Sequence, residues 1–82
     1  GKSFQVGVAF GIAVRKIRLA RKLTQEQLGF EAGLRRTYIS SIELGDKQPS
    51  LKTIYSISKA FGIPMSKLLQ QTEKEIDPKT RE

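Results

Sequence analysis

The chain of 82 residues has no cysteine and no histidine. Disulfides, thiolate zinc sites, imidazole metal ligands and Cys or His nucleophiles are therefore excluded. Ser40 and Ser41 have no histidine to activate them, and Glu26 and Glu31 are too far apart to share a helix face as paired carboxylates. No glycine-rich phosphate cradle or metal-ligand spacing is present. We therefore predict no catalytic residues, no metal site and no cofactor, and hence no enzyme.

Long apolar runs are also lacking. The most apolar stretch, residues 4–14, is interrupted by Gln5, Gly7 and Gly11 and is too short to span a bilayer. Lys2 precedes it, as in a secretory signal, but no convincing small-residue cleavage site follows. Binding to a membrane surface would need a solvent-facing apolar stripe, whereas we expect this stripe to be buried. The prediction is a chain without a membrane partner.

Acidic residues are scarce in the first 72 positions, where twelve Lys or Arg stand against four acids, a net charge of +8. The last ten residues carry a net charge of −1, so the positive excess belongs to the part that folds. Such a charge is expected of a domain that binds a polyanion, although it can also serve only solubility. A single small domain of this length often gains stability by pairing with a copy of itself.

Apolar residues recur at helical spacing along most of the chain, without strand-like alternation, internal repeats or low-complexity tracts. The spacing predicts a first helix that starts near Val8, a fourth over residues 51–61 and a short fifth with Pro64 at or near its first turn. Ser50 can cap the fourth helix and Gly62 can close it. The residues expected on the buried sides are Phe10, Ala13, Val14 and Ile17; Leu51, Ile54, Ile57, Ser58 and Phe61; and Met65, Leu68 and Leu69.

Two short helices are expected between these segments. Thr24 is a plausible N-cap, and Gln27 completes a capping box, which predicts a helix over residues 25–32. Gly33 follows, where a helix end favours a residue that accepts positive φ. The next helix starts near Arg35 and ends at Gly45. Two helices joined by a short turn that contains glycine have the outline of a helix-turn-helix.

The domain organisation follows from these elements. We predict an all-α fold of five helices around one core, over residues 8–71, with the helix-turn-helix at the second and third helices. Residues 1–7 are expected to form a flexible N-terminus. Residues 72–82 are charged, contain Pro78 and have only Ile76 as an apolar anchor, so we expect a flexible tail.

The third helix has two different faces. Ile39 and Ile42 share one face, whereas the opposite face carries small polar residues headed by arginines: Arg35, Arg36, Thr37, Ser40 and Ser41. Small hydroxyl residues let a helix enter a groove, and arginine can reach guanine edges or phosphates. As ordinary surface charges, the two cations would each oppose the helix dipole by about 0.3–1 kcal/mol, which favours an anionic ligand there. Leu44 on this side either contacts a thymine methyl group or is simply exposed.

Several runs of the sequence resemble the phage-repressor (Cro-like or XRE-like) helix-turn-helix family over about residues 9–70. These runs are Leu23-Thr24-Gln25-Glu26-Gln27-Leu28, Ala32-Gly33, Arg36-Thr37-Tyr38-Ile39-Ser40, Ile42-Glu43, Gly45 and Pro49-Ser50-Leu51. The Arg-Thr-Tyr-Ile-Ser run is also similar to the controller proteins of restriction–modification systems. One departure is Gly29, which stands where the family usually has Ala.

The resemblance implies a lambda-repressor-like domain that regulates transcription in the cytoplasm. It would bind a pseudo-palindromic double-stranded DNA operator as a homodimer, and RNA polymerase is a further implied partner. The implied base-reading residues are Arg35, Arg36, Thr37, Ser40 and Ser41. The implied phosphate contacts are Gln25, through its side chain or the helix N-terminus, with Tyr38, Lys47, Ser50 and Lys52. Arg18 and Glu43 match a pair that ties the first helix to the third.

Two alternatives stay open. Ile63, Met65 and Leu69 offer more apolar surface than a small core needs, so they either form the seam of a dimer or cap the core of the monomer. The alternative function is a protein-interaction module, such as an antitoxin-like partner, that reuses the fold without an operator. The net charge favours DNA, because an interaction module would not require it.

Overall fold

The computed structural model describes residues 2–76, with side chains from residue 5 onward. Five helices occur in this part, and no strand: α1 (Lys2–Ala20), α2 (Gln25–Ala32), α3 (Arg36–Glu43), α4 (Leu51–Phe61) and α5 (Met65–Glu75). The predicted all-α fold of five helices is confirmed. None of the helices in residues 2–76 is both long and apolar enough to cross a membrane.

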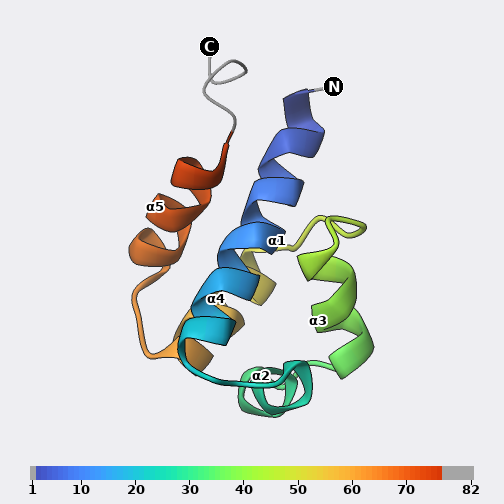
Figure 1. The fold of residues 1–82 in the computed structure, drawn as a ribbon, viewed down its shortest axis with the longest axis vertical. Coiled ribbons are helices and arrows are strands. Elements are labelled where there is room, and N and C mark those ends of the chain that lie inside the picture. Colours follow the sequence, from blue (N-terminus) through green and yellow to red (C-terminus); the bar gives the residue numbers. More distant parts are fainter. Residues whose placement is uncertain (1, 77–82) are drawn as a thin grey trace.

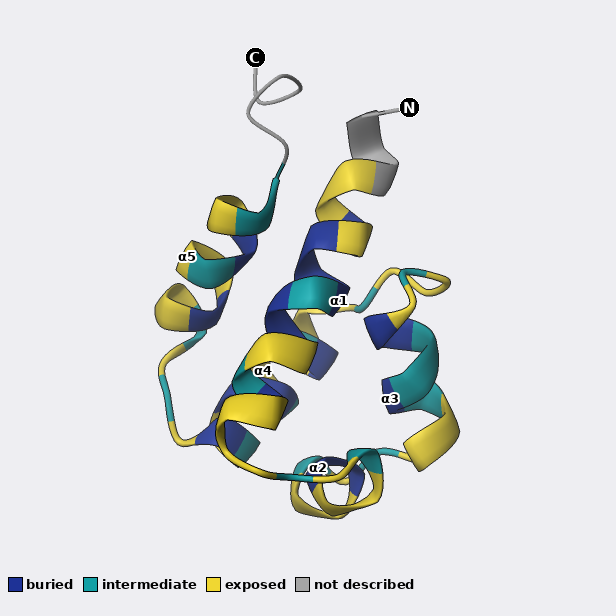
Figure 2. Ribbon diagram, viewed as in Figure 1, coloured by how far each residue is buried: buried dark blue, intermediate teal, exposed yellow. Residues whose placement is uncertain are grey.

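Helix α1 is the axis of the molecule. Figure 1 shows α5 antiparallel along one side of α1, α3 on the other side and α2 across the lower end. Both α5 and α3 pack directly on α1. The buried sides of the helices face inward in Figure 2, and the core cluster consists of Phe10, Val14, Leu28, Ile39, Ile42, Ile57, Phe61 and Leu68.

Local capping sets the bounds of α2 and α4. The Thr24 hydroxyl accepts the backbone N–H of Gln27 at 3.0 Å, and the Gln27 side chain accepts the N–H of Thr24 at 2.8 Å. The Ser50 hydroxyl accepts an N–H from the first turn of α4. Gly33 (φ 69°) and Gly62 (φ 71°) end the two helices in the left-handed conformation, which glycine adopts without steric cost. The bounds predicted for both helices are confirmed.

The start predicted for the first helix is wrong, because α1 begins at Lys2 rather than near Val8. Glycine has a low helix propensity, but Gly7 and Gly11 lie within α1 and allow close packing. A Cβ atom on Gly11 would lie 2.2 Å from the carbonyl oxygen of Ile42, so this glycine lets α1 approach the end of α3. A Cβ atom on Gly7 would lie 3.1 Å from the side chain of Gln48. Tertiary contact therefore outweighs the low helix propensity of glycine.

The predicted start of the tail is also wrong, since α5 continues to Glu75. Thr72 is buried, and its hydroxyl donates to the carbonyl oxygen of Leu68 at 3.0 Å. The Lys16 ammonium lies 2.9 Å from the Glu75 carboxylate, which joins the last turn of α5 to α1. The rest of the predicted tail, from residue 77, lies outside the described residues.

One residue predicted to be buried on the fourth helix is exposed. Leu51, the first residue of α4, is 69% exposed, whereas Ile57, Ser58 and Phe61 are buried as expected. Thr53 is buried instead. The side of α4 that faces the core is therefore rotated away from Leu51, which leaves an apolar residue on the surface.

Candidate nucleic-acid interface

The turn between α2 and α3 depends on a glycine inside α2. The backbone N–H of Leu34 donates to the carbonyl oxygen of Gly29 at 2.8 Å. A Cβ atom on Gly29 would lie 2.5 Å from the carbonyl oxygen of Leu34, so the turn passes too close to α2 for alanine in this geometry. The glycine that departs from the family pattern thus fixes how tightly the turn folds back on α2.

Helix α3 presents the predicted two faces, although it is shorter than predicted. It runs from Arg36 to Glu43, with Arg35 as N-cap and Leu44 as C-cap. Its start is exposed in Figure 2, and Ile39 and Ile42 are buried in the core. The residues expected to read bases share the other side: Arg35, Arg36 and Thr37 are exposed, and Ser40 and Ser41 are half-buried. Leu44 is 70% exposed.

The two arginines at the start of α3 remain available for a ligand. Among the described residues, neither Arg35 nor Arg36 forms an ion pair. Arg35 makes no side-chain hydrogen bond to the helix that it precedes. Their charges add to the positive end of the helix dipole, so the start of α3 is a suitable place for an anion.

A buried ion pair fixes the other end of α3. The Arg18 guanidinium donates from Nε to Oε2 of Glu43 at 2.6 Å and from Nη2 to Oε1 at 3.0 Å. A third donor of Arg18 reaches the carbonyl oxygen of Leu23 at 2.8 Å. The hydrogen bond to Glu43 raises the pKa of Arg18, although burial acts in the opposite direction. In this structure the predicted pair therefore joins α1 to α3.

Two further side chains approach Glu43. Nε2 of Gln25 donates to Oε1 of the carboxylate at 3.1 Å, and an Arg15 guanidinium nitrogen lies 3.9 Å from the same oxygen. Sequence reasoning assigned Gln25 to phosphate and did not include Arg15. The position of Arg15, three residues before Arg18 on the same side of the helix, was a signal that could have found it.

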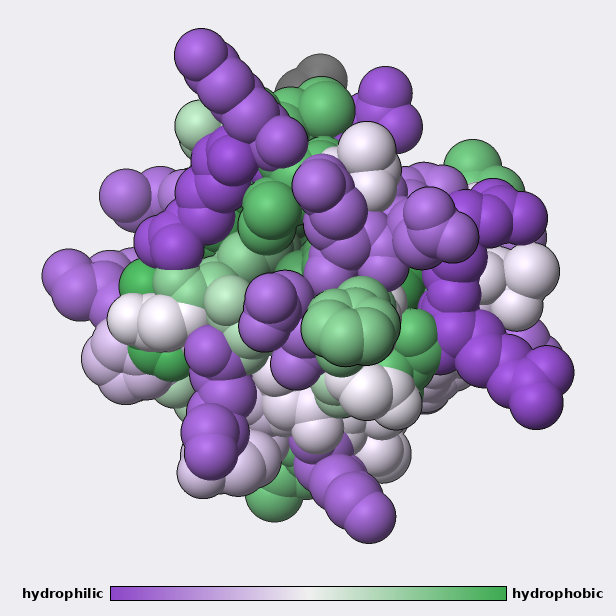
Figure 3. Space-filling model, turned by 90° about the horizontal axis from the view of Figure 1, so that it is seen from below, coloured by the Kyte–Doolittle hydropathy of each residue, from purple (hydrophilic) through white to green (hydrophobic). Residues whose placement is uncertain are grey.

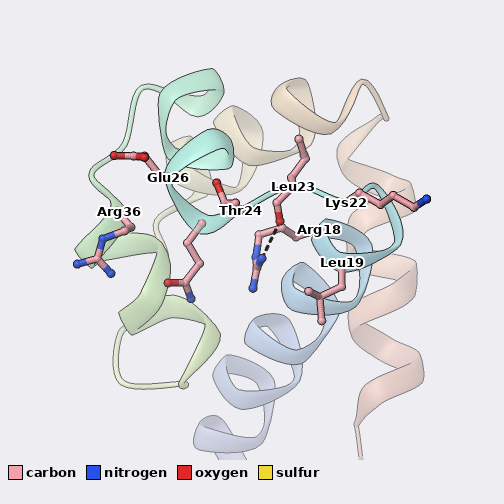
Figure 4. A pocket seen from close by; sticks show the side chains of 8 residues that line it. Arg18, Leu19, Lys22, Leu23, Thr24, Glu26 and Arg36 are labelled. Atoms are coloured by element: carbon pink, nitrogen blue, oxygen red, sulfur yellow. Dashed lines mark hydrogen bonds between the residues drawn. The ribbon is translucent and has the colours of Figure 1, made fainter.

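An open groove of about 630 Å³ lies beside this pair, between the end of α1 and the starts of α2 and α3. Figure 4 shows Lys22 and Arg36 on opposite sides of the groove, with Arg18 between them. Glu26 is the single acid in a lining that otherwise consists of Arg18, Leu19, Lys22, Leu23, Thr24, Gln25 and Arg36. Because Arg18 is paired with Glu43, the cations of the lining without an ion pair among the described residues are Lys22 and Arg36. They outnumber the carboxylate of Glu26, which favours a phosphate backbone at this groove.

Lys22 was not among the predicted site residues. It is the only non-glycine residue of the described chain with positive φ, at 59°. Nothing in the sequence indicates this conformation, which typically costs an ordinary side chain about 1–2 kcal/mol. Lys22 lines the edge of the groove, and Figure 4 shows its ammonium group projecting outward from the other lining side chains.

The other predicted phosphate contacts differ in availability. Lys47 and Lys52 are exposed, so their ammonium groups can reach a neighbouring strand. Tyr38 is half-buried with its hydroxyl 3.5 Å from Oγ1 of Thr53, and it packs against the core. The Ser50 hydroxyl already caps α4 and donates to Oγ1 of Thr53 at 3.1 Å.

The three residues predicted for a dimer seam do not form one exposed patch. Ile63 packs against the core cluster, Met65 is half-buried and Leu69 is 39% exposed. Leu69 instead lines a small groove of about 90 Å³ with residues of α1, α4 and the loop before α4: Val6, Gly7, Phe10, Gln48, Pro49, Ile54 and Thr72.

Exposed apolar residues on α4 adjoin this groove. Leu51 and Tyr55 follow one stripe of α4, next to the position of Ile54 in the groove. By contrast, Figure 3 shows the end of the molecule where α2 lies, with hydrophilic side chains projecting around scattered apolar ones. Phe30 on α2 is 85% exposed. The apolar surface that could pair two copies thus includes α4 as well as α5.

Comparison with known proteins identifies relatives that resemble this chain in sequence and in fold. The sequence model of the helix-turn-helix family matches residues 14–68. Control protein C.BamHI of Bacillus amyloliquefaciens is 47% identical over 68 residues, which cover 82% of this chain and 84% of that protein.

Two solved structures of restriction–modification controller proteins have the same fold. C.AhdI from Aeromonas hydrophila superposes with a TM-score of 0.73 and is 38% identical, covering 74% of this chain and 92% of that chain. C.Esp1396I, solved as a tetramer in complex with its natural 35-base-pair operator, superposes with a TM-score of 0.80. It is 31% identical and covers 87% of this chain and 93% of its own.

Proposed function

The chain belongs to the helix-turn-helix family, of the Cro-like or XRE-like kind, and from this premise we propose that it is a sequence-specific regulator of transcription. Its ligand is a double-stranded DNA operator. The observation that carries the proposal is the start of α3, where Arg35 and Arg36 are exposed and have no ion-pair partner among the described residues. They lie at one end of a polar, partly exposed helix face beside a groove whose lining includes Lys22 and Arg36.

Base recognition belongs to α3, which we dock in the major groove. The guanidinium groups of Arg35 and Arg36 donate to guanine edges or to phosphates, and a bidentate contact discriminates between bases by about 1–3 kcal/mol. Thr37, Ser40 and Ser41 are small enough to let the helix axis approach the base pairs. Ile39 and Ile42 hold the opposite side of α3 in the core, so the reading face points away from the protein.

Phosphate contacts surround this face and give affinity for any sequence. Lys22 and the first residues of α2 line the groove beside α3, where one DNA strand would pass, and the first backbone N–H groups of a helix can bind its phosphates. Lys47 and Lys52 are exposed on the other side of α3, in the loop before α4 and in its first turn. These cations displace counterions from DNA, so binding should weaken as the salt concentration rises.

The active unit is a homodimer on a pseudo-palindromic operator, because two copies of α3 must enter successive major grooves. The exposed apolar residues Leu51, Tyr55 and Leu69 support this proposal. The operator complex of C.Esp1396I, a tetramer, supports assembly on DNA in a related protein.

The cellular role that we propose is that of a controller protein of a restriction–modification system, acting on DNA in the cytoplasm and without enzymatic activity. The identity to C.BamHI supports it. The family resemblance supports a further contact with RNA polymerase, which would let the same protein activate as well as repress.

Selection of bound duplexes from a random pool tests the proposal, followed by anisotropy titration of the selected and a random duplex at two salt concentrations. We expect one enriched pseudo-palindrome and an affinity for it at least about a thousandfold above that for random DNA. Absence of DNA affinity even at low salt would overturn the proposal and favour a protein-interaction module.

A further inference from the structure

The carboxylate of Glu43 joins three helices at one point beside the proposed DNA groove. We propose that Gln25 is a positioning residue, whose carboxamide holds the start of α2 to the end of α3 through Glu43 and so sets the angle at which α3 enters DNA. In this role its side chain does not serve as a phosphate ligand. The inference rests on the proposed function, which it deepens.

The geometry gives the carboxamide a defined partner. Gln25 is the first residue of α2, Glu43 is the last residue of α3, and the distance from Nε2 to Oε1 is 3.1 Å. Glu43 is buried, and Arg18 anchors the same carboxylate to α1 through two donors. A hydrogen bond to an ionised group is stronger than one between neutral groups. Gln25 is therefore held by an acceptor that is itself fixed.

The hydrogen bond from Gln25 to Glu43 is a second connection between the two helices of the motif. The first connection is at the turn, where the hydrogen bond from the N–H of Leu34 to the carbonyl oxygen of Gly29 joins the end of α2 to the start of α3. At the opposite ends of the two helices, the hydrogen bond from Gln25 to Glu43 joins the start of α2 to the end of α3. Helix α3 is about 12 Å long, so a connection at its far end restrains the direction of its axis more than a second contact near the turn would.

Phosphate can be bound here without the Gln25 side chain. The first N–H groups of a helix have no acceptor within the helix and point outward, toward an anion. The Thr24 hydroxyl accepts the N–H of Gln27, which leaves the N–H groups of Gln25 and Glu26 for a ligand. The side chain of Gln25, which donates to Glu43, is therefore available to position α3.

Replacement of Gln25 by methionine tests the proposal, because Gln25→Met keeps the length of the side chain and removes its donor. Gln70→Met makes the same change at an exposed position of α5 and serves as the matched control. We expect Gln25→Met to weaken binding to the selected operator about five- to tenfold, with random-duplex affinity within about twofold of the parent. Equal losses on both duplexes would overturn positioning and indicate a phosphate ligand. No loss on either duplex would also overturn positioning.

Nitrogen–proton correlation spectra of the free protein give a readout that does not depend on DNA. If Gln25 positions α3, Gln25→Met shifts the amide signals of α3 along residues 36–43, whereas Gln70→Met leaves them in place. Shifts confined to the neighbours of residue 25 would overturn the inference. If the unmodified protein shows no preference for any duplex, the proposed function fails, and these spectra still decide whether Gln25 sets the pose of α3.

Discussion

Helix α1 forms ion pairs on two of its sides, and the two pairs are built differently. On the side of α3, Arg18 and Glu43 have side chains only 7% and 3% exposed, joined by hydrogen bonds of 2.6 and 3.0 Å. On the side of α5, the Lys16 side chain is 61% exposed, whereas the Glu75 side chain that it contacts is only 12% exposed. Removal of either partner of the buried pair would leave an unpaired charge inside the protein, whereas water can solvate the lysine of the other pair.

The same contrast holds for the backbone along α1. On the side of α3, Gly11 lets a carbonyl oxygen of α3 approach closely. On the side of α5, contact depends on Lys16 and on the buried Leu68 and Thr72. Helix α3 is therefore fixed by close packing and a buried charge pair, while the last turn of α5 is joined to α1 by a pair whose lysine is exposed. Four predictions test this difference, beginning with the largest effect.

Glu43→Ala should destabilise the fold most, by about 3–5 kcal/mol, because it leaves the Arg18 guanidinium buried without its carboxylate. Urea unfolding followed by circular dichroism measures the loss. The double variant with Arg18→Met should recover part of it, since no buried charge then remains unpaired. A loss below about 1 kcal/mol for Glu43→Ala would remove the distinction between the two sides of α1.

Gly11→Ala should cost about 1–3 kcal/mol, since the new methyl group would meet the carbonyl oxygen of Ile42 at 2.2 Å and push α1 from α3. Gly7→Ala is the matched control, because its methyl group meets only the side chain of Gln48, at 3.1 Å. Thermal unfolding compares the two variants. Equal or higher stability of Gly11→Ala would mean that α3 does not depend on this close approach.

Arg36→Ala should leave stability within about 0.5 kcal/mol and weaken operator binding by about 1–3 kcal/mol, because Arg36 is exposed and has no described ion-pair partner. This variant distinguishes Arg36, which contributes to DNA binding, from Arg18, which stabilises the fold. Lys47→Ala, by comparison, should weaken operator and random duplexes alike. Anisotropy titrations on both duplexes check this, and a uniform loss for Arg36→Ala would contradict base reading.

Lys16→Ala should have the smallest effect, below about 1 kcal/mol, because the Lys16 side chain is 61% exposed and pairs of exposed charges contribute little. The hydrogen bond from Lys16 lowers the pKa of Glu75 below its ordinary 4.5, against the raising effect of burial. The stability contributed by this pair is therefore complete above pH 4.5 and is lost as the pH falls through the lowered pKa. Urea midpoints between neutral and acid pH should converge for the parent and Lys16→Ala. A gap that widens in acid would contradict this sign.

Much of the candidate interface could be predicted because its elements are local. The capping box of Thr24 and Gln27, the cap at Ser50 and the helix ends at Gly33 and Gly62 each involve residues only a few positions apart. The two faces of α3 follow from helical periodicity alone. The pairing of Arg18 with Glu43 was accessible only through the family resemblance, because nothing local joins residues that far apart in sequence.

The predictions that failed concern contacts between distant segments. Glycines 7 and 11 look like helix breakers until α3 and the loop before α4 lie against them. Leu51 has the spacing of a core residue, but the rotation of α4 against its neighbours exposes it. The bond from Gln25 to Glu43 could not be predicted either, since it depends on the angle between α2 and α3.

The sequence by itself determined the number of helices, the caps that bound α2 and α4, the basic character of the folded part and the polar face of α3. These features depend on backbone conformation, periodicity and charge, which are set by residues close together in the sequence. Only the tertiary structure decided where α1 begins, which apolar residues stay exposed, and how Lys22 and Gln25 meet the groove. Those features depend on distances of a few ångströms between helices, which are set by the packing of all five at once.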